Sequence, residues 1–478
     1  MTRRLKVATA LVVVLSAPSC AMLEPELPAA DPAIEVEWPL PPTTVATSAS
    51  LAAPSANPAP ATGATADIGW RDFFTDAKLE ELIARALANN RDLRVAVLNV
   101  ERARAQYRIQ RADRVPSIGV NGTMVRTGGD APTTDIFSVG LGVTEFELDL
   151  FGRVRNLSQA ALENYFSQEE ARRSAQLSLV AEVANVYLTV AADRERLRLA
   201  RATLRTREES HALTEKRHEL GAVSALDVNQ SRTEVEGARA DAARYAGQIA
   251  QDTNALTLLV GAPVEADLLP TMFDDQVTGL APLPAGLPSE VLLRRPDVLQ
   301  AEHLLRAANA NIGAARAAFF PSITLTGSIG SASSELSGLF DSGTQVWSFV
   351  PQVNVPIFEG GRLRARLGAA TAGRDIALAR YEQSIQQGFR EVADALALTA
   401  TLAEQRTALQ ALVEAATRAE ELAQARYAAG RDSYLVRLEA QRTLYVAQQL
   451  LILTRLAEQS NRVTLYKVLG GGWNETSP

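Results

Sequence analysis

The residues that could carry out chemistry are few, and their spacing matches no catalytic motif. The chain has one cysteine and three histidines among its 478 residues. The pair His218-Glu219 lacks the second histidine that a zinc-hydrolase helix requires, and a single cysteine excludes a disulfide framework or a cysteine-based metal centre. Gly140-x-Gly142 is half of a dinucleotide-binding fingerprint, and small residues that face a lumen from a strand explain it better. We therefore expect no enzymatic activity, no metal and no cofactor.

Cys20 offers the one covalent modification that we expect, which is acylation by lipid. A basic start and the apolar run Val7–Leu15 lead through small residues to Cys20, which is typical of a secretory signal. The segment resembles a bacterial lipobox, although Ala17 stands where leucine is usual. Residues 1–19 are therefore predicted to be removed, leaving N-acyl and S-diacylglycerol groups on Cys20, and Ala21 in place of an aspartate indicates the outer membrane. An ordinary signal peptide with an incidental cysteine is the alternative.

Composition limits the class of protein further. The 47% of hydrophobic residues argues against wholesale disorder, and the absence of long apolar runs after the N-terminus excludes a polytopic helical membrane protein. The net charge of −7 leaves no basic footprint for nucleic acid. Residues 20–66 comprise the lipid anchor and a segment with nine of the 22 prolines, which predicts an extended tether without a core.

The rest of the chain consists of two similar halves. Asp92–Ile118 aligns with Asp297–Ile323 at an offset of 205 residues, and Arg217-x-x-x-Gly221 aligns with Arg426-x-x-x-Gly430 at an offset of 209. A period of this length indicates duplication of a half-molecule rather than a solenoid. The predicted divisions are a first repeat at 67–265, a second repeat at 266–470 and a C-terminal tail at 471–478.

Each repeat contains a stretch that predicts a long helical hairpin. Arg153–Leu220 has neither proline nor glycine, and Arg362–Ala429 has the same length of 68 residues without proline. A helix of that length spans about 100 Å, and apolar residues recur at the three- and four-residue spacing of a coiled coil. Glycines favour helix ends, so residues 153–260 and 362–469 are predicted to reverse at Gly221 and Gly430.

Two strands are predicted before each hairpin, at about 116–148 and about 321–357. Apolar residues alternate there with small polar ones, as in Phe137, Val139, Leu141 and Val143 against Ser138, Gly140, Gly142 and Thr144. Such alternation is typical of transmembrane β-barrel strands, with a soluble sandwich as the alternative. Four strands cannot close a membrane barrel, so the barrel must be shared: two subunits give eight strands and three give twelve.

Several segments closely resemble one known family. The segment 287–298, Leu-Pro-Ser-Glu-Val-Leu-Leu-Arg-Arg-Pro-Asp-Val, is the most specific, and Trp70-x-x-Phe73-Phe74-x-Asp76 and Asp149-Leu150-Phe151-Gly152-Arg153 are similar too. Together they resemble the TolC-like outer membrane factors, in their lipoprotein NodT-type efflux branch, over about residues 67–470.

The resemblance implies a mainly α protein with a β-barrel portion, assembled as a homotrimer in the outer membrane of a Gram-negative bacterium. It implies that a shared 12-stranded transmembrane β-barrel continues into a trimeric α-barrel, a long periplasmic tunnel. An equatorial belt would come from residues 68–90, 262–295 and the C-terminus. The implied partners are outer membrane lipid, a periplasmic adaptor (membrane fusion) protein and an inner-membrane pump of the proton-driven RND type.

The resemblance also implies which residues matter at the hairpin turns. Asp227 and Tyr427 match an acid and a tyrosine of the family's gate, whereas Asp432 occupies a slot that often holds arginine, with Arg431 one place earlier. Three symmetry-related Asp432 carboxylates near the axis would repel one another and attract cations. The alternative is that Asp432 caps the second arm of its hairpin. Gly221 and Gly430 are the expected turn residues at the adaptor contact.

The expected function is that of an outer membrane exit duct in a tripartite efflux system for small molecules such as drugs. The outer membrane channel of a type I protein secretion system is an alternative use of the same architecture. A periplasmic adaptor would have one hairpin between split lipoyl-like halves, and a structural coiled-coil scaffold would need no alternating strands. The sequence does not identify the cargo.

Overall fold

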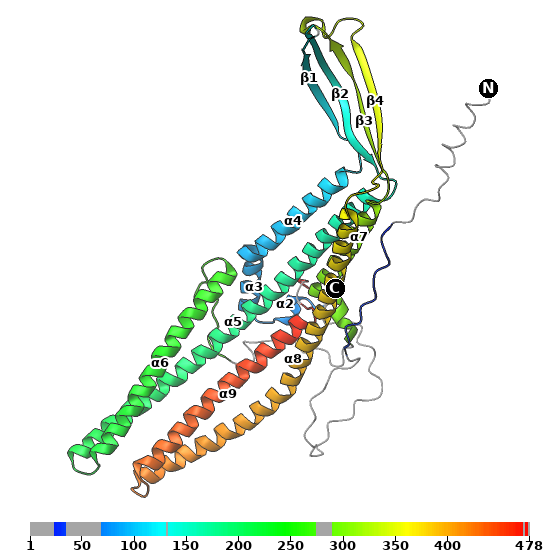
Figure 1. Ribbon diagram of the computed structural model, residues 1–478. Helices are drawn as coiled ribbons and strands as arrows, with labels where there is room; N and C mark the ends of the chain where they lie inside the picture. The colour runs from blue at the N-terminus through cyan, green and yellow to red at the C-terminus, as the bar shows by residue number, and fades with distance from the viewer. Residues whose placement is uncertain (1–22, 35–67, 131, 274–288, 472–473, 477–478) are drawn as a thin grey trace. The chain divides into compact units, whose positions relative to one another are not determined.

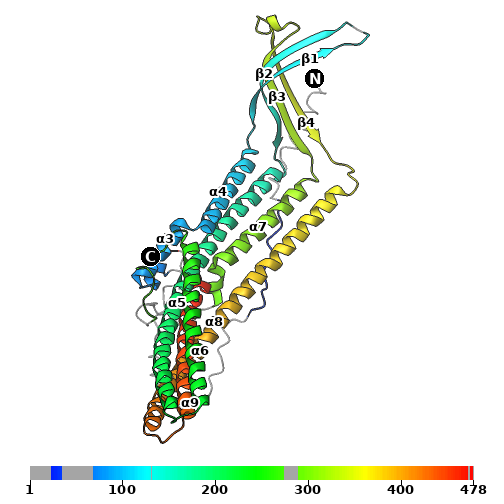
Figure 2. The same cartoon turned by 90° about the vertical axis from the view of Figure 1, so that its left-hand side faces the viewer.

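The computed structural model describes residues 23–34, 68–130, 132–273, 289–471 and 474–476, and it is mainly helical with one four-stranded β-sheet (Figures 1 and 2). That much of the predicted fold class is confirmed. In chain order the elements are α2 (Trp70–Phe73), α3 (Ala77–Asn89), α4 (Arg91–Ala112), β1 (Ile118–Thr127), β2 (Thr134–Leu148), α5 (Arg153–Glu219), α6 (Ala225–Val260), α7 (Pro296–Ala317), β3 (Ser322–Ser333), β4 (Gln345–Asn354), α8 (Arg362–Ala428) and α9 (Tyr434–Val468), with short 3-10 helices at Ser289–Arg294 and Leu336–Gly338.

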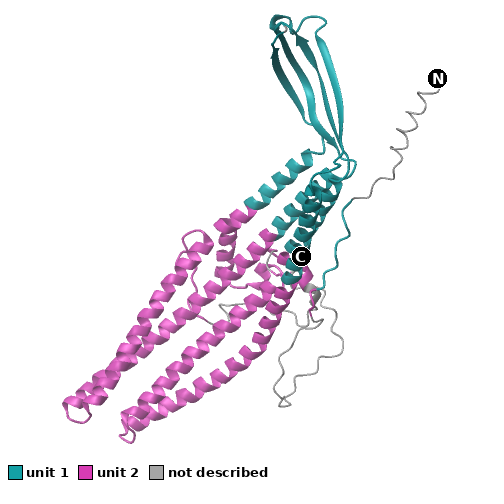
Figure 3. Cartoon of the chain, in the orientation of Figure 1, with its two compact units in different colours: residues 1–31, 98–170, 299–384 teal, residues 32–97, 171–298, 385–478 magenta. Residues whose placement is uncertain are grey.

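The chain divides into two compact units, each built from three separate stretches (Figure 3). The first comprises residues 1–31, 98–170 and 299–384 and contains the sheet. The second comprises residues 32–97, 171–298 and 385–478 and contains both hairpin turns. Neither unit corresponds to one of the two predicted repeats, because each repeat contributes to both units.

The sheet of the first unit is antiparallel throughout, in the order β1-β2-β3-β4. Ile118 pairs with Val143 at one end of the β1–β2 ladder, and Thr127 pairs with Thr134 at the other. The β2–β3 register shifts between Val143 and Phe146, where Glu145 takes a left-handed backbone conformation with φ of 52°. Such a bulge increases local twist. Because the order is open, β1 and β4 each have one edge without a partner strand within the sheet.

Both predicted faces of the sheet are present. On the small-residue face, Gly140 pairs with Gly330, and a Cβ on Gly330 would lie 2.2 Å from the carbonyl oxygen of Val139. Only glycine permits this close approach of β2 and β3. On the apolar side, Ile118 and Trp347 are 74% and 75% exposed. A single chain therefore leaves large apolar side chains uncovered, which marks a surface that needs another environment or partner.

The two hairpins contain the longest helices. Helices α5 and α8 each have 67 residues, and α6 and α9 have 36 and 35. Each long helix ends two residues before the glycine at which the hairpin was predicted to reverse. Among the described helices, only α5 contains a window apolar enough to cross a membrane, and 61% of that window is buried inside the structure. A core helix of a soluble protein can contain a mostly buried apolar window of the same kind.

The hydrophobic core of the second unit joins α2 and the residue Ile68 before it to the end of α9. The rings of Phe73 and Tyr466 stack with centroids 3.9 Å apart, and the Tyr466 hydroxyl donates a hydrogen bond to the carbonyl of Ile68 at 2.7 Å. From α5, the hydroxyl of Tyr187 donates to Asp76 Oδ2 at 2.7 Å, while Asp76 also caps α3. The Tyr187 hydrogen bond anchors the middle of α5 to the start of α3, and Tyr187 shares one hydrophobic core with Phe73 and Tyr466.

The described residues 23–34 form neither helix nor strand, and part of this segment is held by hydrogen bonds. Arg316 donates to the carbonyl of Leu23 at 3.2 Å, and Asn309 donates to the carbonyl of Pro25 at 2.7 Å. The backbone N–H of Asp31 donates to Glu382 at 3.1 Å. Residues 23–31 therefore lie against α7 and α8, which composition alone did not indicate. Cys20, the rest of residues 1–22 and residues 35–67 lie outside the described residues.

Candidate functional site at the hairpin turns

The two hairpins reverse through the same arrangement of backbone hydrogen bonds. Gly221 N–H donates to His218 O at 2.8 Å, and the next N–H, of Ala222, donates to Arg217 O at 2.8 Å. In the second turn, the Gly430 and Arg431 N–H groups make the equivalent bonds 209 residues later. This pattern is a Schellman motif, which places its glycine in the left-handed region, and φ is 70° and 69° at the two glycines.

Replacing Gly430 with alanine should destabilise the turn by about 1–2 kcal/mol, the cost of a left-handed conformation for a residue with a Cβ. No atom lies within 4 Å of that Cβ position, so the cost is conformational rather than steric. Gly237→Ala is the matched control, because Gly237 is also open but lies inside α6. There alanine should stabilise by about 0.5–1 kcal/mol. Thermal unfolding of both variants measures the difference, and equal shifts would contradict the strained turn.

Asp227 lies in the first turn of α6 and completes a capping box. Its Oδ2 accepts from the Ser224 backbone N–H at 3.0 Å and from the Ser224 hydroxyl at 2.7 Å, and its own N–H donates to that hydroxyl. Such a box satisfies backbone donors at the helix start. The structure thus gives the Asp227 carboxylate a local partner, and within the part of the chain described it shows no contact between Asp227 and the second turn.

Asp432 has a charged partner that the sequence analysis did not identify. The alternative that Asp432 caps α9 is wrong, because the residue at the N-cap is Ser433. Asp432 instead accepts two hydrogen bonds from Arg426, from Nε at 2.6 Å and from Nη2 at 2.8 Å. This bidentate pair spans the turn of the second hairpin. The hydrogen bonds from Arg426 lower the pKa of Asp432 below its ordinary value and raise the pKa of Arg426.

Tyr427 lies between two arginines. The guanidinium of Arg217, from α5, lies 5.2 Å from its ring centroid, and that of Arg437, from α9, lies 5.4 Å from it. The Tyr434 ring packs edge-on at 5.9 Å. Cations over an aromatic face are attracted by its quadrupole. Tyr427 therefore connects the end of the first hairpin to the second hairpin, so the two turns lie together.

The structure thus joins some of the predicted gate residues and separates others. Tyr427 and Asp432 belong to the second turn, but each contacts an arginine that had no assigned role. Arg431 is exposed, and its side chain makes no ion pair within the described ranges. The missed arginines, Arg217 and Arg426, were visible in the sequence as equivalent positions four residues before each glycine.

Farther from the turns, polar contacts link α6 to α9. The Glu234 side chain is 9% exposed and lies between Arg207, at 3.1 Å, and Arg442, whose Nε donates to it at 2.8 Å. Burial and the hydrogen bond to Asp241 raise the pKa of Tyr445, whose hydroxyl donates to that carboxylate at 2.9 Å. These pairs hold the two hairpins to each other beyond the turns.

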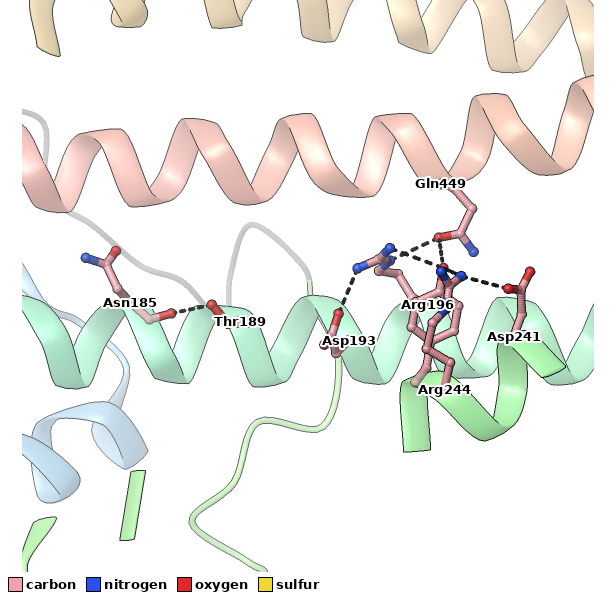
Figure 4. A network of polar contacts seen from close by, with 8 residues as sticks. Asn185, Thr189, Asp193, Arg196, Asp241, Arg244 and Gln449 are labelled. Atoms are coloured by element: carbon pink, nitrogen blue, oxygen red, sulfur yellow. Dashed lines mark hydrogen bonds and ion pairs between the residues drawn. The ribbon is translucent and has the colours of Figure 1, made fainter. Parts of the chain in front are cut away.

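The next contact is a network around Arg196 of α5 (Figure 4). Its guanidinium donates to Asp193 at 3.1 Å, to Gln449 of α9 at 3.0 Å and to the Tyr245 hydroxyl of α6 at 3.1 Å. The guanidinium of Arg196 therefore connects three helices. Asp252 of α6 is affected by the same aspartate: burial, with a further contribution from the charge of Asp193, raises the pKa of Asp252.

The arrangement can position charges and aromatic rings, but it does not resemble a reaction centre. Among the described residues, no group of three or more His, Cys, Asp or Glu side chains could hold a metal ion. What the turns offer is a bidentate ion pair, a tyrosine between two cations and exposed apolar side chains at the ends of long helices.

Comparisons with known proteins agree with one another over most of the chain. A profile described as "Outer membrane efflux protein" matches residues 82–262 and 287–471. The toluene efflux pump outer membrane protein TtgC of Pseudomonas putida is 51% identical over 420 residues, covering 86% of this chain and 87% of that protein. The antibiotic efflux pump outer membrane protein ArpC of Pseudomonas putida is 48% identical over 465 residues, covering 95% of this chain and 93% of that protein.

A solved structure gives the same result. The open state of the MtrE outer membrane channel of Neisseria gonorrhoeae superimposes with a TM-score of 0.85 at 37% identity. The match covers 96% of this chain and all of that one.

Proposed function

This chain belongs to the outer membrane efflux protein family, and from that premise we propose how its residues form the exit duct of a tripartite efflux system. The chain is an outer membrane channel and not an enzyme, since its family and its relatives are outer membrane efflux proteins. The single observation that carries this function is the family match over both halves of the chain.

Three copies of the chain share one barrel in this proposal. The sheet has four strands and two open edges, and open edges are not tolerated in the hydrocarbon of a membrane. Bacterial membrane barrels start at eight strands, and three chains supply twelve. The exposed apolar residues of β1 and β4 then face lipid, and the small residues face the lumen. Three pairs of hairpins, six in all, line the periplasmic tunnel.

The turns form the periplasmic gate. Around a three-fold axis, the Arg426–Asp432 pair occurs three times, and each pair ties the two ends of one turn together. Because each carboxylate is neutralised by a bidentate guanidinium, the ring carries less negative charge than three free aspartates would. The pair also acts as a local clasp across the turn. Tyr427, in contact with Arg217 and Arg437, joins the two turns of one chain.

Ion selectivity of the purified channel should change little between pH 7 and pH 4. The folded-state pKa of Asp432 is lowered by Arg426, so the pair stays charged above that pKa and is lost only as the pH falls through it. Below it, Arg426 is unpaired and the preference should shift toward anions. In Arg426→Ala, repulsion among free carboxylates raises their pKa, so selectivity should already vary near pH 4. Reversal potentials across a planar bilayer measure this, and identical pH profiles would contradict it.

The exposed leucines of the turns form the adaptor contact. Leu220 and Leu226 flank the first turn and are 83% and 65% exposed, and Leu435 follows the second turn at 56% exposed. Apolar side chains at such tips are typical of protein–protein contacts. A periplasmic adaptor protein docks there and connects the channel to an inner-membrane pump of the RND type.

Efflux in living cells tests the proposal. In Pseudomonas putida without TtgC, this chain should restore toluene tolerance when the pump is active and not when the pump is deleted. Leu226→Asp should abolish tolerance, because a charge would have to be buried at the adaptor contact. Leu258→Asp, the same change at an exposed site at the other end of α6, is the control. No restoration by a chain that reaches the outer membrane would contradict the proposal and favour protein secretion.

The cargo is small organic molecules in this proposal, because two relatives are named for toluene and antibiotics. The channel is additionally held by acyl groups on Cys20. The position of Leu23 against Arg316 supports this, because it places Leu23 beside α7, six residues before β3 begins. Palmitate incorporation into wild type, and its loss in Cys20→Ser, is the measurement.

A further inference from the structure

A cavity of about 590 Å³ lies in the second unit, between α5, α8 and α9. It is distinct from the turns, since its residues lie far along each helix from Gly221 and Gly430. On α5 the lining runs from Ser178 to Thr189 at three- and four-residue intervals, which is one face of the helix and a length of about 16 Å. Its volume falls in the range of small-molecule sites.

One hydrogen-bond acceptor in this cavity is buried and lacks a donor. The Oδ1 atom of Asn185 is buried and has no hydrogen-bond partner in the described structure. Figure 4 shows the Asn185 side chain on the side of α5 that faces α9. Glu182 is exposed and makes no ion pair with any described residue. Asp394 is also exposed, and its one ion pair is with Arg390, 4.0 Å away on the same helix. A buried acceptor without a partner is costly, so a ligand that supplies a donor is favoured.

The donors in the lining are mostly committed elsewhere. The Asn461 amide donates to Ala395 O at 2.8 Å and to Thr399 Oγ1 at 3.0 Å. The Thr189 hydroxyl donates to the backbone carbonyl of Asn185 at 2.8 Å, not to its side chain. The Thr464 hydroxyl donates to its own helix, to Ser460 O at 2.9 Å. Lys467 supplies one positive charge at the cavity, against the two carboxylates.

The remaining lining is apolar. Val186 of α5, Leu398 of α8 and Val468 of α9 contribute to it, together with alanines that leave room between the helices. Glu391 also lines the cavity, but its carboxylate is already paired with Arg295 at 2.8 Å. The cavity therefore combines an apolar surface, a buried amide oxygen and two solvent-exposed carboxylates, with Lys467 as the cation in its lining.

We propose that this cavity binds an organic ammonium ion with an apolar body. The ammonium group donates to Asn185 Oδ1, the carboxylates of Glu182 and Asp394 provide the negative potential, and the body covers Val186 and Leu398. Binding as such does not depend on the channel function. Use of the cavity as a holding site for cationic cargo rests on the proposed function.

Equilibrium binding to the purified full-length protein tests the site. The probes are 1-naphthylmethylammonium, the neutral 1-naphthylmethanol and the anionic 1-naphthylacetate, which share one aromatic body and differ in charge. The cation should bind saturably and at least about ten-fold more tightly than either other probe, a difference of about 1.4 kcal/mol. Equal affinity of all three probes, or no saturable binding of the cation, would overturn the proposal.

Variants locate the site. Asn185→Leu and the double variant Glu182→Gln/Asp394→Asn should each weaken binding of the cation by about ten-fold or more, while Asn185→Asp, which adds a carboxylate in the same shape, should tighten it. Glu404→Gln removes an exposed charge of α8 outside the cavity and should change nothing. If Glu404→Gln lost as much affinity for the cation as the double variant, binding at this cavity would be rejected. Conductance of wild type is recorded in parallel: a conducting channel without probe binding rejects this inference alone.

Discussion

Replacing Asp432 with alanine should raise the ion conductance of the channel several-fold and shift its preference from cations toward anions. The carboxylate of Asp432 accepts both hydrogen bonds of the Arg426 fork, so the variant loses the clasp across the turn and leaves three unpaired guanidiniums at the ring. Loss of the clasp loosens the constriction, and the unpaired positive charge repels cations. Single-channel recording in a planar bilayer with a salt gradient measures both effects.

The partner variant separates the two effects. Arg426→Ala breaks the same clasp, so conductance should again rise, but it leaves three free carboxylates and should increase the preference for cations. Combining both substitutions should keep the high conductance and restore selectivity close to that of wild type. Glu404→Ala, which removes an exposed carboxylate far from the turn, serves as the control. Unchanged conductance and selectivity in Asp432→Ala would reject the assignment of the gate.

Removing the Glu234 carboxylate should be the most destabilising single change among the polar contacts of the hairpins. Its side chain is 9% exposed and accepts from two arginines, of which Arg207 is itself only 11% exposed. Truncating one partner of a buried pair leaves an uncompensated charge, at a cost of about 3 kcal/mol. Glu234→Ala should therefore lower the thermal unfolding temperature by several degrees.

Two comparisons make this expectation specific. Glu234→Gln keeps an acceptor for one arginine, so its unfolding temperature should lie between those of wild type and Glu234→Ala. Glu404→Ala removes an exposed carboxylate and should stay within about 0.5 kcal/mol of wild type. If Glu234→Ala and Glu404→Ala unfold at the same temperature, the contact between α6 and α9 does not stabilise the protein as a buried ion pair would.

The hairpins were predictable because local composition determines them. The 68-residue stretches without proline allow continuous helix, and Gly221 and Gly430 end them because only glycine adopts the left-handed turn at little cost. Alternation of small and apolar residues likewise placed the four strands to within a few residues. These signals need no knowledge of distant parts of the chain.

Contacts between distant segments were not predictable from such signals. The bulge at Glu145 and the stacking of Phe73 on Tyr466 depend on register and packing that periodicity does not encode. The hydrogen bond from the Trp70 N–H to Asn474 O, which ties α2 to the C-terminal tail, joins residues about 400 positions apart. Local sequence patterns do not indicate which residues pair at that separation.

The turns show the same limit at the level of the candidate site. The family resemblance selected Tyr427 and Asp432. It also indicated that the position of Asp432 often holds an arginine, but it did not identify the partner of Asp432. The charge partner of Asp432 is Arg426, six positions earlier, and the two meet only because the Schellman turn at Gly430 brings them together. Geometry of the turn, not residue type, decides which arginine is the partner.

Single-particle imaging of the detergent-extracted protein tests the central claim most directly. We expect a particle with three-fold symmetry, a hollow tunnel and a barrel to which each chain contributes four strands. At the end of the tunnel, three Arg426–Asp432 pairs should surround the narrowest point. A monomer, or a particle whose helices pack into a solid rod without a lumen, would contradict the shared barrel and the exit duct.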